Sequence, residues 1–192
     1  NNFLNIPFNL PNFFLNKYSI KIFNTFYYNM HFLIKKEKNV VWNKFFYPLD
    51  KIINWNRLYG SKGFIQFQTV IPFKNSYKGI NEIINKIQEK KSGSFLTVLK
   101  KFGAYRDGLS FPMEGYTITL DFPCNKKNFS LLDELDKIAL KYNGKFYLAK
   151  DSRMSPESYK QNIIYAREFE LFRSTNGLDK KFCSFQSNRL SL

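Results

Sequence analysis

The chain has 192 residues, enough for one or two compact units with their own cores. Its 44% hydrophobic and 23% charged residues are typical of a globular protein, and no apolar run approaches the ~20 residues that a membrane-spanning helix needs. With 30 basic against 15 acidic residues, the net charge of +15 favours anionic partners such as phosphate groups, acidic lipid surfaces or nucleic acid. The basic residues are spread along the chain, so the charge alone identifies no partner.

Histidine and cysteine are scarce. The single histidine, His31, and the two cysteines without metal-ligand spacing, Cys124 and Cys183, argue against structural zinc and against histidine-based catalysis. We read both cysteines as free thiols in a reducing compartment. The first residues lack an initiator methionine and a charged signal-peptide leader, so we expect the chain to begin inside a longer protein.

The first third of the chain predicts an extended lead-in followed by a helix. Prolines and asparagines in residues 1–12 indicate an extended segment. Residues 13–33 contain no Pro or Gly and have apolar residues at helical spacing, which predicts a long helix. Residues 45–47, F-F-Y, precede Pro48 and predict a strand leading into a turn. Residues 52–55 predict a short helical turn.

Residues 64–71, F-I-Q-F-Q-T-V-I, predict a strand that ends at Pro72. Its period of two places Gln66 and Gln68 on one face. Two neighbouring amides need partners if they are buried, because an unpaired buried polar group costs roughly 1–3 kcal/mol. Either a ligand or a neighbouring loop can supply those partners.

Strands and helices alternate after this point. Residues 78–90 predict an amphipathic helix. Residues 94–102 predict a strand in which Lys100 shares a face with apolar residues; such a lysine either extends its ammonium outward to water or is held there for a function. Residues 115–123, G-Y-T-I-T-L-D-F-P, alternate regularly and predict a half-buried strand. Its polar face carries Thr117, Thr119 and Asp121.

The last part of the chain predicts one more helix, a short strand and a polar tail. Ser130 with Asp133 is a weak capping signal for a helix that stops at Asn143-Gly144. The apolar run that begins at Phe146 predicts a strand ending at the cluster K-D-S-R, residues 150–153. Residues 155–192 have little apolar material and must dock on another surface to be ordered. Together these elements predict an α+β fold with a mostly antiparallel sheet flanked by helices.

Four segments resemble, in the same order, a family of FAD-linked oxidoreductases typified by decaprenylphosphoryl-ribose 2'-oxidase and related more distantly to aldonolactone oxidases. They are F-F-Y-P-L-D-K-I-I-N-W-N-R-L-Y-G (45–60), G-F-I-Q-F-Q-T-V-I-P (63–72), L-S-F-P-M-E-G-Y-T-I-T-L-D-F-P (109–123) and F-Y-L-A-K-D-S-R-M (146–154). The resemblance implies that residues 1–145 are the substrate-binding (cap) domain. It implies that residues 146–192 return to an FAD-binding domain, which holds most of the FAD contacts and is not in this chain.

The resemblance also implies roles for particular residues. Lys150 and Gln68 match catalytic positions, and with Tyr147 they match contacts to FAD. The residues that match the substrate pocket are Gln66, Lys100, Thr117 and Thr119. The two threonines depart from the family pattern, because the mycobacterial enzymes have an asparagine and a cysteine there. This difference puts the substrate in question.

The implied reaction removes two electrons from a secondary alcohol of a sugar and passes a hydride to the flavin. The expected substrate is a polyprenyl-phosphate-linked pentose, with an aldonolactone oxidase as the alternative enzyme. A basic nucleic-acid-binding module without catalysis is the alternative from another class, although the expected partners include no nucleic acid. We expect a cytoplasmic protein; attachment to the inner face of the membrane through peripheral contact and a periplasmic location stay open.

Overall fold

The computed structural model describes residues 4–11, 16–32, 39–47, 51–94, 96–104, 110–162 and 166–192 of the chain. The ends of the helix predicted at 13–33 and the turn predicted at Pro48 lie outside these ranges. The elements in chain order are β1 (Leu4–Asn5), α1 (Lys17–Phe32), α2 (Trp42–Phe46), β2 (Ile52–Ile53), the 3-10 helix η3 (Trp55–Tyr59), β3 (Phe64–Pro72), α3 (Phe73–Glu89), β4 (Thr97–Phe102), β5 (Gly115–Pro123), α4 (Lys126–Lys141), β6 (Lys145–Phe146), the 3-10 helix η4 (Leu148–Lys150), α5 (Pro156–Asn162), α6 (Ala166–Thr175), α7 (Leu178–Lys181) and α8 (Phe185–Leu190).

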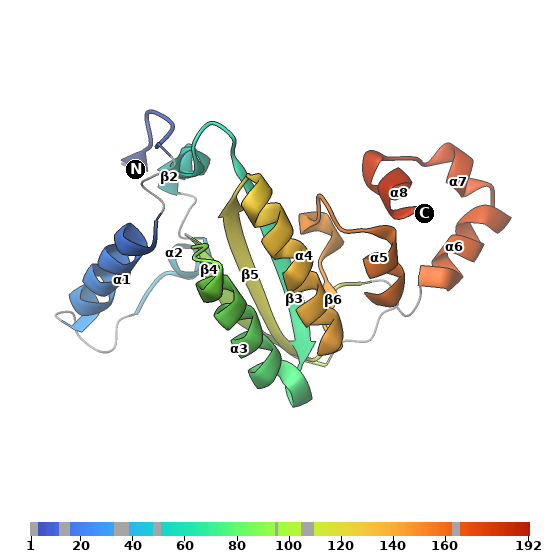
Figure 1. Cartoon of the computed structure of the whole chain (residues 1–192), viewed down its shortest axis with the longest axis horizontal. Coiled ribbons are helices and arrows are strands. Elements are labelled where there is room, and N and C mark those ends of the chain that lie inside the picture. Colours follow the sequence, from blue (N-terminus) through green and yellow to red (C-terminus); the bar gives the residue numbers. More distant parts are fainter. Residues whose placement is uncertain are drawn as a thin grey trace.

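A four-stranded antiparallel sheet forms the centre of the molecule, with the strand order β4-β5-β3-β6. The long strands β3 and β5 pair over their full lengths, with Gln68 opposite Thr119 near the middle. The short strand β6 pairs with Thr69 and Val70 of β3. Helices α3 and α4 lie side by side across one face of the sheet (Figure 1). The predicted α+β fold with a mostly antiparallel sheet flanked by helices is therefore confirmed.

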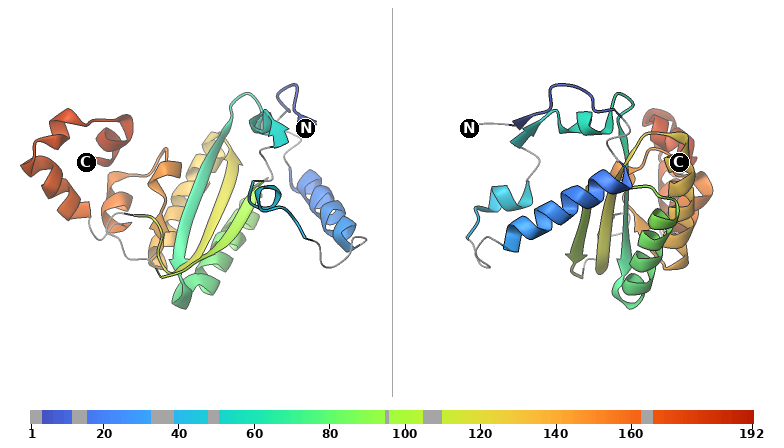
Figure 2. Two further views of the ribbon diagram at one scale, coloured as in Figure 1. Left: turned by 180° about the vertical axis from the view of Figure 1, so that it is seen from behind. Right: turned by 60° about the vertical axis from the view of Figure 1, so that its left-hand side comes forward.

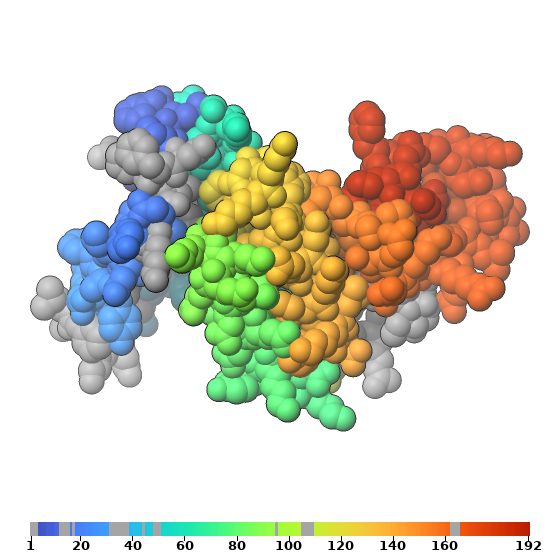
Figure 3. Space-filling model, viewed as in Figure 1, coloured from blue at the N-terminus to red at the C-terminus, as the bar shows by residue number. Residues whose placement is uncertain are grey.

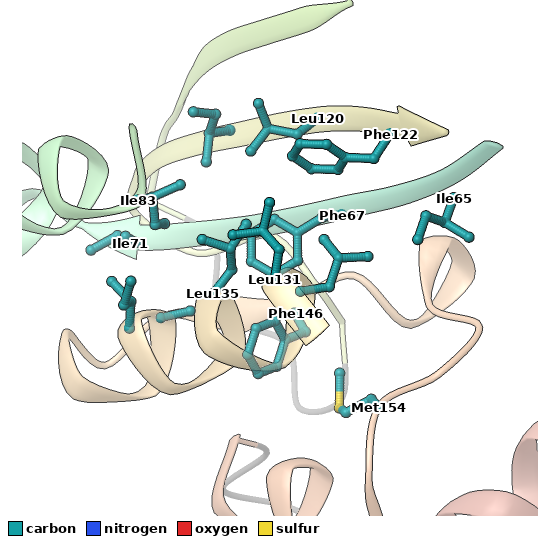
Figure 4. Packing of buried hydrophobic residues seen from close by; sticks show 14 of the residues in the cluster. Ile65, Phe67, Ile71, Ile83, Leu120, Phe122, Leu131, Leu135, Phe146 and Met154 are labelled. Atoms are coloured by element: carbon teal, nitrogen blue, oxygen red, sulfur yellow. The ribbon is translucent and has the colours of Figure 1, made fainter. Parts of the chain in front are cut away.

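The hydrophobic core lies between this sheet and the two helices (Figure 4). Alternate positions of the strands and one face of each helix supply most of its apolar residues: Ile65, Phe67, Ile71, Ile83, Ile118, Leu120, Phe122, Leu131, Leu132, Leu135, Ile138, Ala139 and Phe146. The period of two in β3 and β5 fixes which side chains point toward the helices, because successive side chains leave a strand on opposite faces. The polar residues between them are thereby placed on the other face.

Two short elements near the amino terminus differ from the prediction. Residues 45–47 are not a strand, because Phe45 and Phe46 end the helix α2 and Tyr47 is its C-terminal cap. Aromatic residues favour a strand only where another strand pairs with them, and within the described part of the chain none does so here. Residues 52–53, predicted as helical, instead pair in parallel with β1, and the helical turn follows as η3.

Both helices that cover the sheet begin earlier than predicted. Helix α3 starts at Phe73, directly after the proline that ends β3. Helix α4 starts after Asn125, whose side-chain oxygen accepts a hydrogen bond of 2.9 Å from the backbone N–H of Asn128. The capping role predicted for Ser130 is therefore wrong, because a better N-cap lies one turn earlier. Strand β4 is also shorter than predicted and begins at residue 97.

The carboxy-terminal segment packs in part on the rest of the chain. Met154, Tyr159, Ala166 and Leu190 are buried and belong to the core cluster. Helix α5 contacts both α4 and α8. The docking surface that this tail requires is thus supplied partly by α4, whereas the division into domains at residue 145 stays a prediction.

The amino-terminal and carboxy-terminal segments lie at opposite ends of the molecule (Figure 3). Both cysteines are free thiols. None of the described helices has the length and apolar character needed to span a bilayer.

Candidate functional site

The face of the sheet that points away from α3 and α4 carries the polar residues of the three long strands. The strand register places Gln66 opposite Asp121, and Gln68 opposite Thr119. Lys100 of β4 lies opposite Thr117. In Figure 2 (left) this face is turned toward the viewer, and α3 and α4 lie behind the sheet. The residues that the resemblance assigns to the substrate pocket therefore share one face of the sheet.

Tyr147 and Lys150 reach the same face from the carboxy-terminal side. The backbone N–H of Tyr147 donates to the carbonyl oxygen of Gln68 at 3.1 Å, just beyond the last paired residue of β6. The chain then turns into η4, in which the N–H of Lys150 donates to the carbonyl of Tyr147 at 2.9 Å. The Tyr147 ring stacks on the ring of Phe111, with the centroids 4.7 Å apart. Lys150 is thereby held beside the outer edge of β3.

Asp151 fastens this turn to the end of the chain. Its carboxylate accepts hydrogen bonds from the backbone N–H groups of Arg153 at 3.0 Å and Met154 at 2.8 Å, and from the Arg189 guanidinium at 2.7 Å. Burial alone would raise the pKa of Asp151, but these donors together hold it below its ordinary value. Asp151 therefore holds the backbone that follows Lys150 in a fixed conformation.

Arg153 fastens the same turn to helix α4. Its guanidinium makes a bidentate pair with Asp136, at 2.7 and 2.8 Å, and also binds Asp133 at 2.8 Å. The Asp136 carboxyl is nearly buried, and this burial raises its pKa although Arg153 opposes the shift. A planar guanidinium paired in this way fixes orientation as well as distance. Of the charged cluster at residues 150–153, Asp151 and Arg153 are thus structural.

Lys150 differs from these neighbours. None of the described residues forms a hydrogen bond or ion pair with its ammonium. Its positive charge nevertheless opposes the rise in the pKa of Asp121 that burial causes. Together with Gln66, Gln68 and Tyr147 it lines a cavity of about 10 Å³, room for roughly one water molecule. The structure thus brings together the residues predicted to be catalytic and cofactor-binding, which come from positions about 80 residues apart in the chain.

The predicted substrate residues occupy the rest of this face. Thr117 is buried, and its hydroxyl accepts a long hydrogen bond of 3.3 Å from the Gln68 amide. Thr119 is half-buried. Lys100 is exposed and stands at the opposite corner, at a Cα distance of roughly 16 Å from Gln66 when strand spacing and rise per residue are applied to the register. Lys100 and Lys150 therefore cannot bind the same small group.

Asp121 is the residue of this face that the sequence left without a function. It is fully buried, and one carboxylate oxygen accepts a hydrogen bond of 2.8 Å from the Gln66 amide. The other oxygen, Oδ2, is buried without a partner among the described residues. Burial raises the pKa of Asp121, whereas the Gln66 hydrogen bond and the charge of Lys150 lower it. The alternating pattern of β5 predicts the face of Asp121 but not its complete burial, which depends on distant segments.

Comparison with known proteins agrees with the motifs. No protein-family model matches the chain. Over 193 residues the chain is 34% identical to decaprenylphosphoryl-beta-D-ribose oxidase of Mycolicibacterium smegmatis, which covers 98% of this chain and 41% of that protein. It is also 29% identical, over 115 residues, to an uncharacterized protein encoded in the mprA 5' region of Streptomyces coelicolor, covering 59% of this chain and 31% of that protein.

The chain thus spans less than half the length of both relatives. An identity of 34% that continues through 98% of the chain includes all four motifs and the site residues between them. The resemblance indicated by the sequence is confirmed: along nearly its whole length, this chain is a relative of the carboxy-terminal part of decaprenylphosphoryl-ribose oxidase.

Proposed function

We propose that the chain is the carboxy-terminal, substrate-binding portion of an FAD-dependent oxidoreductase that oxidises a secondary alcohol of a sugar. The observation that carries the proposal is the convergence of Gln66, Gln68, Tyr147 and Lys150 on one cavity at the edge of β3. The relative that is 34% identical is an oxidase of a decaprenyl-phosphate-linked ribose. An FAD-binding unit outside this chain would complete the site.

The residues around the cavity fit the edge of a flavin ring. A flavin presents carbonyl and ring-nitrogen acceptors, and the Lys150 ammonium is a donor without a recorded partner in the described part of the chain. Tyr147 and Phe111 present stacked rings beside it. When bound, FAD would accept the hydride that leaves the alcohol carbon, which carries both electrons, while the hydroxyl proton leaves to water or a base. Lys150, Tyr147 and Gln68 are the residues that would hold it here.

The side chains of this face would bind and orient the sugar. The positive charge of Lys150 stabilises negative charge that develops beside it, because the surrounding protein screens charge less than water does. The amides of Gln66 and Gln68 are placed to hydrogen-bond hydroxyl groups. Thr117 and Thr119 lie on the same face, and the exposed ammonium of Lys100, at the far corner of this face, suits a phosphate group of the substrate.

A groove at the other edge of the sheet, beside β4 and on the side of α3, supports a substrate linked to a lipid, such as a polyprenyl-phosphate-linked pentose. A cavity of about 720 Å³ opens between α1, α3 and the start of β4. Apolar residues such as Ile20, Ile84 and Ile87 line it, with Lys21 and Lys91 also in the lining. No acidic side chain of the described residues lines it. An apolar groove of this size with nearby cations suits an amphiphile that carries an anionic head group.

Helices α1 and α2 support a peripheral contact with a membrane that contains such a substrate. Phe26 of α1 is 68% exposed and Phe45 of α2 is 70% exposed. The first turn of α1 contains no acidic residue. Exposed aromatic residues beside lysines are typical of segments that lie in the interface of anionic membranes. A lipid-linked substrate would be reached from that surface.

Replacing Lys150 by alanine in the full-length, flavin-loaded protein tests the proposed function. Because Lys150 is expected to stabilise charge only as the reaction proceeds, K150A should lower kcat by about 10²–10³-fold. The flavin absorbance per protein should stay near the wild-type value, since most FAD contacts belong to another unit. The measurement is oxidation of farnesylphosphoryl-ribose with an artificial electron acceptor, alongside the visible spectrum.

Lys137→Ala is the matched control, because Lys137 is an exposed lysine of α4. Equal kcat values for K150A and wild type would refute the proposed role of Lys150. Oxidation of aldonolactones but not of lipid-linked pentoses would identify the alternative enzyme. A native protein without flavin would refute the assignment as an oxidoreductase.

A further inference from the structure

The buried carboxylate of Asp121 lies next to the candidate site, on the strand that pairs with β3 and opposite Gln66. It is 0% exposed and comes from the same face of the sheet as the predicted substrate residues. Its backbone N–H donates a hydrogen bond of 3.0 Å to the Ser94 hydroxyl. Its side chain contributes one hydrogen bond, to Gln66, and leaves Oδ2 without a partner among the described residues. A buried carboxylate with an unpaired oxygen is costly, so a purely structural role explains it poorly.

The hydrogen bond to Asp121 determines which way the Gln66 amide points. An ionised carboxylate only accepts hydrogen bonds, so the amide must turn its NH₂ group toward Asp121. The carbonyl oxygen of Gln66 is then left to accept from another donor, and Gln66 also lines the cavity that Lys150 lines. The site therefore presents an acceptor at this point, which suits a substrate hydroxyl rather than a carbonyl oxygen.

Two other ionisable side chains face Asp121. Lys150 of η4 acts on it with a positive charge that favours the carboxylate. Tyr59 of η3 is almost fully buried, and its pKa is raised by burial first and then by the negative charge of Asp121. Tyr59 is therefore neutral at ordinary pH, which leaves Lys150 as the counter-charge of Asp121.

We propose that Asp121 is a positioning residue of the site, which orients the Gln66 amide so that its carbonyl oxygen accepts from a sugar hydroxyl. This inference rests on the proposed function and deepens it, because it assigns a hydroxyl-binding acceptor to the site. The orientation of Gln66 depends on a hydrogen bond, so it can be tested apart from the negative charge of Asp121.

Two substitutions separate the hydrogen bond from the charge in the full-length, flavin-loaded protein. Asp121→Asn removes the charge but keeps an oxygen that accepts from Gln66, so KM should change less than threefold. Asp121→Leu removes both, so KM for farnesylphosphoryl-ribose should rise about tenfold, as the loss of one hydrogen bond to a charged group implies.

A second readout does not require activity. Thermal unfolding at pH 7 should be unchanged or higher in Asp121→Asn. The raised pKa of Asp121 means that folding disfavours its ionised form, so its contribution to stability falls as pH rises through the folded pKa.

Several results would overturn the proposal. If Asp121 only held the strand, Asp121→Asn would lower the unfolding temperature. An unchanged KM in Asp121→Leu would refute the orientation of Gln66 by Asp121. Absence of sugar oxidation in the wild-type protein would contradict the proposed function, whereas an unchanged KM in an active oxidase would contradict only the role of Asp121.

Discussion

At the scale of single residues, Asp151 and Arg153 fix the position of Lys150 through different contacts. Asp151 binds two backbone N–H groups and Arg189, and Arg153 binds Asp136 on α4. These contacts satisfy the two neighbours within the chain and leave the Lys150 ammonium directed to the cavity. Because several hydrogen bonds hold the backbone of this turn, the Lys150 side chain keeps a defined position.

Replacing Asp151 by asparagine tests the contribution of the Asp151–Arg189 contact to stability, which should depend on pH. At neutral pH, D151N should lower the free energy of unfolding by about 3 kcal/mol, because Arg189 loses a buried partner. The folded-state pKa of Asp151 lies below its ordinary value, so its stabilisation is present at neutral pH and is lost as pH falls through that lower pKa. Urea unfolding of both proteins between pH 7 and pH 3 should therefore show the difference narrowing in acid.

Asp133→Asn is the comparison for this experiment. Asp133 also binds Arg153, but its side chain is 66% exposed, and exposed ion pairs contribute little. D133N should lose less than about 1 kcal/mol at pH 7. A loss of unfolding free energy as large as that of D151N would show that the contacts of Arg153 stabilise the turn more than those of Asp151.

At the scale of elements, the pairing of β3 with β5 places most of the candidate site. The register sets Gln66 opposite Asp121 and ends with Pro72 opposite Gly115. A β-carbon added to Gly115 would lie 2.2 Å from the carbonyl oxygen of Ile71. Glycine at this point therefore allows the close approach of the two backbones that maintains the register.

Gly115→Ala should disturb this pairing. Because backbone atoms rather than a flexible side chain meet the new methyl group, the free energy of unfolding should fall by about 1–3 kcal/mol. Gly103→Ala is the matched control, since a β-carbon there meets no atom within 4 Å. Chemical denaturation of both variants tests the difference, and equal stabilities would contradict the close approach.

At the scale of the whole molecule, the exposed apolar residues gather toward the two ends. The carboxy-terminal helices expose Leu171, Phe172, Phe182 and Phe185, and Phe185 is 97% exposed. The same segment is anchored on its other side through Arg189 and Leu190. A segment that is anchored on one side and apolar on the other is suited to a further protein surface. We infer that the exposed apolar side of α6–α8 docks on the FAD-binding unit of the proposed enzyme.

Hydrogen exchange tests this arrangement. Backbone amides of α6, α7 and α8 should exchange more slowly in the full-length protein purified from its source cells than in this chain alone. The amides of α3 serve as the internal reference, because that helix packs on the sheet and on α4 within the chain. Equal exchange of α6–α8 in both samples would contradict docking on an FAD-binding unit.

The sequence by itself determined the two long strands of the sheet, the faces of these strands and the resemblance to an oxidase. Periods of two and 3.6 are local properties, so 64–71 and 115–123 revealed their buried faces without knowledge of the rest of the chain. The same locality explains the errors at residues 45–47 and 52–53, where aromatic and branched residues fit a helix or a strand and only pairing decides.

Only the tertiary structure decided how the site is assembled. No local pattern relates Lys150 to Gln66, because the two meet through the antiparallel return of β6 along β3. No local pattern separates Asp151, which binds Arg189, from Lys150 beside it, which lines the cavity. The burial of Asp121 likewise depends on distant segments. Charge and hydrogen-bond partners act across space rather than along the chain, so these roles followed from the fold.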